Sequence, residues 1–85
     1  MAMTDRAKLQ DELARLDSSR QELDREIRDA HDRQRYGTDP DEIEAAKREE
    51  RDKVVAMDRL MTRIRAVEGQ LLVAGKAGAE PSHLS

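Results

Sequence analysis

The chain has 85 residues, of which 36% are hydrophobic, and it contains no cysteine. A chain this short and this poor in apolar residues cannot bury a conventional globular core, and without cysteine it cannot build a disulfide framework or a thiolate metal site. Although 41% of its residues are charged, the net charge is only −3 and the apolar residues recur at regular intervals, which favours long helices over disorder. We therefore expect an all-α protein of the coiled-coil type.

The first predicted element is a helix over about residues 4–36, with Thr4 as its N-cap. Its seam residues follow an alternating spacing of four and three, which defines a narrow stripe of two residues per heptad. These seam residues are Leu9, Leu13, Leu16, Arg20, Leu23, Ile27, Ala30 and Gln34. Arg20 is polar, and a polar seam residue often fixes the register or oligomeric state of a coiled coil, with Asp17, Asp24 or Asp58 available to neutralise it.

The chain is predicted to reverse at about residues 37–39. Gly37 is expected to take the positive φ that closes the first helix, and Asp39 and Pro40 are expected to be the N-cap and the first residue of the next helix. Because this connection is short, the two helices should lie side by side and antiparallel. The acidic residues Asp39, Asp41 and Glu42 then lie at the tip of the hairpin.

The second predicted helix covers about residues 40–74 and repeats the same spacing, with Gly75 as its stop and residues 76–85 as a flexible tail. Its seam residues are Ile43, Ala46, Glu50, Lys53, Met57, Leu60, Ile64, Val67, Leu71 and Ala74. Residues 1–75 therefore form a two-helix antiparallel coiled-coil hairpin. Folding about residue 38 places apolar residues opposite each other far from the turn but sets Ile27 against Glu50 near it, so packing is expected to weaken toward the turn.

Extra apolar residues beside the second seam, Val54 and Met61, widen the apolar stripe of that helix. The first helix has Asp17 and Asp24 at the equivalent flank and does not match this width. A homodimer that forms a four-helix bundle would cover the broad stripe. Its predicted interface comprises Val54, Met57, Leu60, Met61 and Ile64. The alternative is that Val54 and Met61 fold over the flank of their own hairpin.

A helix from another protein is predicted to bind the half near the turn, against Leu23, Ile27 and Val54. Nucleic acid is an improbable partner, because eight basic residues on the first helix are offset by nine acidic ones. No apolar run approaches the roughly 20 residues that span a bilayer, and residues 1–6 lack the core of a signal peptide. We therefore expect a cytoplasmic protein with no membrane contact.

No catalytic, cofactor or metal site is predicted. The sequence shows no nucleophile paired with a base and no phosphate-binding glycine loop, and His31 and His83 lack ligand spacing. Carboxylates at the tip are ligands that Mg²⁺ accepts, but acids in a first turn also cap the helix and complement its dipole. The second explanation is favoured, because the spacing lacks the EF-hand pattern.

Three segments resemble the small YdcH-type coiled-coil hairpins of bacteria. They are Leu16-Asp17, Glu22-Leu23-Asp24-Arg25-Glu26-Ile27 and Lys53-Val54-Val55-Ala56-Met57-Asp58-Arg59-Leu60, within a resemblance that spans about Leu9 to Leu72. This resemblance implies two helices and self-association, and it carries no established activity. It supports our first hypothesis, a non-enzymatic interaction or adaptor module that acts through self-association and helix-mediated partner binding.

The tip resembles a second family. The segment Asp39-Pro40-Asp41-Glu42-Ile43-Glu44-Ala45-Ala46 is similar to the tip of the coiled-coil arm of DksA and Gre factors, which enter the secondary channel of RNA polymerase tip-first. The resemblance implies that Asp39 and Asp41 stand in place of the acids that act near the catalytic metal. This sequence contains neither zinc-finger cysteines nor the globular domain that anchors the arm in those families. The alternative hypothesis is thus a transcription regulator with an acidic hairpin tip.

Overall fold

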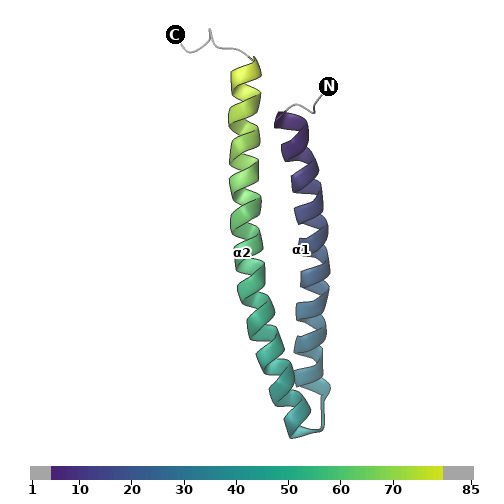
Figure 1. Ribbon diagram of the computed structural model, residues 1–85. Helices are drawn as coiled ribbons and strands as arrows, with labels where there is room; N and C mark the ends of the chain where they lie inside the picture. The colour runs from purple at the N-terminus through teal and green to yellow at the C-terminus, as the bar shows by residue number, and fades with distance from the viewer. Residues whose placement is uncertain (1–4, 80–85) are drawn as a thin grey trace.

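The computed structural model describes residues 5–79, which form two antiparallel α-helices joined by a short turn (Figure 1). Helix α1 comprises Asp5–Tyr36 and helix α2 comprises Pro40–Ala79. The predicted helical hairpin is confirmed. Neither helix contains, within the described residues, an apolar stretch long enough to cross a membrane.

The start of α2 has the geometry that its sequence predicts. Pro40 is the first helical residue, where the missing N–H of proline costs nothing. Asp39 precedes it as the N-cap, and its Oδ1 accepts a hydrogen bond from the backbone N–H of Asp41 at 3.0 Å. The carbonyl of Asp39 accepts the first helical bond, from the N–H of Ile43 at 2.9 Å.

Gly37 ends α1 by a different route from the predicted one. No glycine among residues 5–79 has a positive φ, so the predicted left-handed cap is wrong. Gly37 instead donates its N–H to the carbonyl of Arg33 at 3.0 Å, which completes an ordinary helical bond and removes the need for a left-handed residue. A Cβ at this position would collide with the same carbonyl oxygen and lie 3.1 Å from Cγ1 of Ile43. Glycine is therefore required at position 37, because the end of α1 and Ile43 of α2 leave no space for a side chain there.

Helix α2 is longer than predicted. It continues through Gly75 to Ala79, so the expected stop at Gly75 is wrong. A glycine inside a helix costs only about 1 kcal/mol relative to alanine, and without a left-handed conformation it does not end the helix. The predicted N-cap Thr4 and residues 80–85 of the predicted tail lie outside the described residues.

The interior of the hairpin is a single line of seam residues. In the part of the chain whose side chains are described, four hydrophobic residues are buried, Ala30 and Ala46 near the turn and Ile64 and Val67 farther from it. All four belong to the predicted seams. Among the described residues no polar or charged residue is fully buried, so every charge of the hairpin keeps some contact with water.

Candidate interaction surface

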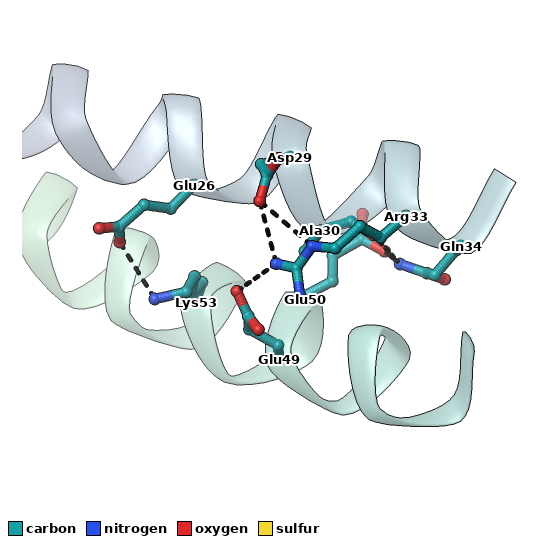
Figure 2. Close-up of polar contacts among 8 residues, drawn as sticks. All are labelled: Glu26, Asp29, Ala30, Arg33, Gln34, Glu49, Glu50 and Lys53. Atoms are coloured by element: carbon teal, nitrogen blue, oxygen red, sulfur yellow. Dashed lines mark hydrogen bonds and ion pairs between the residues drawn. The ribbon is translucent and has the colours of Figure 1, made fainter. Parts of the chain in front are cut away.

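The turn half of the hairpin, residues 24–53, is bridged by charged side chains (Figure 2). Arg33 on α1 binds Glu49 on α2, with 2.7 Å between Nη2 and Oε2, and also reaches Asp29 at 3.1 Å. The hydrogen bond from Arg33 lowers the pKa of the Glu49 carboxyl, and the same bond raises the pKa of the Arg33 guanidinium. Both pKa shifts favour the charged pair, which therefore joins the two helices most firmly at neutral pH.

Three further polar side chains bridge the helices beside this pair. Lys53 donates to Glu26 at 3.0 Å, and Gln34 donates to both Glu50 and the carbonyl of Ala30. The second carboxylate oxygen of Glu50 lies 3.5 Å from Nδ1 of His31. The polar seam residues thus find partners, as expected, although Glu50 engages Gln34 and His31 where the sequence placed Ile27.

The expectation that this half is more weakly packed stays a prediction, although its two seam alanines are well covered. Ala30 and Ala46 are 0% and 1% exposed, so the two backbones approach closely there. Small seam residues leave little volume to fill between the helices, and the long polar side chains close the flanks over them. Polarity of the seam near the turn therefore does not imply a loose interface.

A groove lies at the opposite end of the hairpin, in the open half that comprises residues 5–23 and 54–79. This groove of about 820 Å³ runs between the first turns of α1 and the last described turns of α2. It is lined by Asp5, Lys8, Leu9, Ala66, Gly69, Gln70, Val73 and Ala74. Below it, Arg63 binds Glu12 across the helices at 2.6 Å.

The three residues predicted to bind a partner helix differ in exposure. Leu23 is half-buried and lies with Ala56 and Leu60 in a second groove of about 370 Å³. Ile27 is also half-buried, and neither it nor Val54 is among the residues that line this groove. Val54 is 49% exposed. Binding of a partner helix to these three residues stays a prediction.

The residues predicted to form the dimer interface divide by exposure. Ile64 is only 6% exposed and is buried in the hairpin interior, so it has almost no surface left for a second copy. Met57, Leu60 and Met61 are half-buried. Val54 is the member of this set that is most open to solvent.

Sequence reasoning missed Leu72, which is 65% exposed on the same helix. Leu72 follows Met61 by eleven residues and Val54 by eighteen, and both separations fit a stripe with alternating steps of four and three. The sequence alone contains this spacing. Leu72 lies close to the predicted end of the helix, however, and was not assigned to the predicted interface. Val55 and Val73 are exposed as well, on a different face of α2.

Two predicted polar features have local structural roles. Arg20 is neutralised by Asp17 at 3.0 Å on its own helix, one of the three partners that the sequence offered. At the tip, Asp39, Asp41 and Glu42 are exposed, and Asp39 uses its carboxylate to cap α2. Within residues 5–79, no three histidine or carboxylate groups come together as ligands of a metal ion would. Action of the tip inside an enzyme channel stays a prediction.

Comparison of the chain with protein families, with curated proteins and with solved structures gave no significant match.

Proposed function

We propose that this chain is a non-enzymatic helical hairpin that acts as an interaction module and that associates first with a second copy of itself. The observation that carries the proposal is the outer face of α2, a stripe with steps of four and three residues that leaves apolar side chains in water. It comprises Val54, Asp58, Met61, Arg65, Glu68 and Leu72. On this face Val54 is 49% exposed and Leu72 is 65% exposed.

The balance of burial supports self-association. Among the described residues of one hairpin only four are buried, and two of these are alanines that contribute little apolar area. Isolated two-helix units with so small an interior are marginal in water. Full burial of a valine or leucine side chain contributes about 1.5–3 kcal/mol, so covering Val54 and Leu72 in each copy would add to stability substantially. A four-helix bundle of two hairpins covers both.

The charges of α1 support the use of α2 for this contact. Asp17 and Asp24 on α1 are held in ion pairs with Arg20 and Arg28 of the same helix. A charged and paired surface of this kind costs desolvation when it is buried. Once the dimer has formed, the groove beside Leu23 is the place at which a helix of another protein would add.

The proposal is tested by the oligomeric state of two matched variants. Val54→Asp places a charge on the outer face of α2, and Val55→Asp places the same charge on the next residue, about 100° around the helix. The two valines are 49% and 52% exposed, so the folded monomer should tolerate both changes equally. We expect sedimentation to show that Val54→Asp dissociates the dimer while Val55→Asp leaves it intact.

Two results would contradict the proposal. A wild-type chain that stays monomeric at all concentrations, with full helicity by circular dichroism, would exclude self-association. A Val54→Asp dimer as tight as the Val55→Asp dimer would exclude the outer face of α2 as its interface.

A further inference from the structure

Two opposite charges flank Met61 on the outer face of α2. Asp58 precedes Met61 by three residues and Arg65 follows it by four, and both side chains are exposed. Some charged residues elsewhere in the hairpin are held in ion pairs, such as Arg15 with Asp11. Asp58 and Arg65 form no ion pair within residues 5–79, and the hydrogen bond recorded for Asp58 is accepted by its backbone carbonyl from Thr62.

The arrangement of these two charges discriminates between the ways in which two copies can meet. In a parallel contact each residue faces its own equivalent, so Asp58 meets Asp58 and Arg65 meets Arg65. Both contacts are repulsive. In an antiparallel contact about a two-fold axis near Met61, Asp58 of each copy meets Arg65 of the other, and opposite charges face each other twice.

From this we propose that two copies dock antiparallel through the outer face of α2, with the two-fold axis beside Met61 and Asp58 of each copy paired with Arg65 of the other. This inference rests on the proposed function. It adds the orientation and the register of the dimer, which self-association alone leaves open.

The positions of the apolar residues on this face are compatible with the same two-fold axis. The two Met61 side chains meet at the axis, where a flexible thioether adapts to its own copy. Val54 lies seven residues before Met61 and Glu68 seven residues after it, so the axis brings Val54 of one copy beside the aliphatic stem of Glu68 of the other. The arrangement that pairs the charges of the face therefore also covers Met61 and Val54.

Orientation is tested directly by cysteine crosslinking, because the natural chain contains no cysteine. At a rise of 1.5 Å per residue, the two Val54 positions of an antiparallel dimer lie about 21 Å apart along the helix axis. Met61→Cys should form a disulfide-linked dimer, and Val54→Cys alone should form none. A mixture of Val54→Cys with a mass-tagged Glu68→Cys should form the mixed disulfide. Efficient linking of Val54→Cys to itself, with no mixed product, would overturn the antiparallel arrangement.

The pairing of Asp58 with Arg65 is tested by reversing one charge and then by exchanging both charges. Asp58→Arg creates two arginine–arginine contacts in the antiparallel dimer and should weaken dimerisation by about tenfold or more, whereas Asp58→Arg with Arg65→Asp should restore it to within about threefold. Asp52→Arg is the matched control, since Asp52 is also exposed and lies off the outer face. If Asp58→Arg dimerises as tightly as this control, the pairing is wrong.

Failure of this inference is distinguishable from failure of the proposed function. A monomeric wild-type chain would remove both. A wild-type dimer that links through Val54→Cys alone, or that Asp58→Arg leaves unchanged, keeps the interaction module and removes the antiparallel register.

Discussion

The two halves of the hairpin are held together by different kinds of interhelical contact. In the turn half the helices meet over alanines, and polar side chains such as Arg33 and Glu49 reach across the flanks. In the open half the buried residues are the β-branched Ile64 and Val67, and a groove of about 820 Å³ lies between the helices. The comparison teaches that a polar seam and a close seam are compatible when the residues between the backbones are small.

The kind of substitution that destabilises each half should depend on the residues that hold its two helices together. Where alanines set the separation of the backbones, added volume pushes the helices apart. Where Ile64 and Val67 fill the interface, lost volume leaves a cavity. Large-to-small substitutions should therefore destabilise the open half most, and small-to-large substitutions should destabilise the turn half most. Unfolding at a fixed protein concentration measures the stability of both kinds of variant.

The largest effect is expected for loss of volume in the open half. Ile64→Ala should lower the free energy of unfolding by about 2–4 kcal/mol, because a buried isoleucine loses its apolar contacts and leaves a cavity. Val55→Ala is the control on the same helix, and since Val55 is 52% exposed it should cost less than about 0.5 kcal/mol. Urea titration followed by circular dichroism measures both. Equal losses for the two variants would mean that Ile64 is not part of a packed interior.

Added volume in the turn half is expected to come next. Ala46→Leu should cost about 1–3 kcal/mol, because the extra carbons have no space between the closely approaching backbones. Ala45→Leu, at the exposed neighbouring position, should change the free energy of unfolding by less than about 0.5 kcal/mol. If Ala46→Leu is tolerated or stabilising in the same urea titration, the turn half is loosely packed after all.

The sequence predicted the architecture because the signals for it are local. Asp39 and Pro40 determine where α2 begins, and the spacing of apolar residues determines which face of each helix turns inward. The buried residues accordingly all come from the predicted seams. Sequence pattern predicts the direction of a side chain well, since direction depends only on helical periodicity.

The separation of the helices could not be predicted in the same way. Whether Glu50 and Lys53 loosen the seam depends on how closely Ala30 and Ala46 allow the backbones to approach, and that is a property of both helices together. The exposure of Leu72 likewise depends on where each helix ends. Interhelical distance and helix overhang are tertiary quantities, so the pattern of a single helix does not give them.

Two glycines, one in each half of the hairpin, should respond to added volume with opposite changes in stability. Gly37→Ala should destabilise the hairpin by about 1–3 kcal/mol, because its Cβ would meet the carbonyl oxygen of Arg33. Gly69→Ala should stabilise it by about 0.5–1 kcal/mol, since no atom lies within 4 Å of the added Cβ and alanine is the better helix former. Thermal unfolding of the two variants should show shifts of opposite sign. A loss of stability in Gly69→Ala would show that the groove at this position is filled.

The smallest effect is expected from the ion pair that closes the turn half. Because the pKa of Glu49 is lowered in the folded hairpin, the pair stabilises the fold fully above the pKa that glutamate has in the unfolded chain. This contribution falls as the pH drops from that value and is gone below the lowered pKa of the folded state. The raised pKa of Arg33 has no effect in acid, since arginine remains charged there.

The difference in melting temperature between the wild type and Glu49→Gln should therefore be present at neutral pH and vanish on acidification through this window. Glu44→Gln is the matched control, because Glu44 is exposed and makes no ion pair with α1 within residues 5–79, so its small difference should not follow the same pH course. A Glu49→Gln difference that persists in acid would come from the shape of the side chain and not from its charge. The alanines would then hold the turn half alone, and the bridging side chains would serve only to cover them.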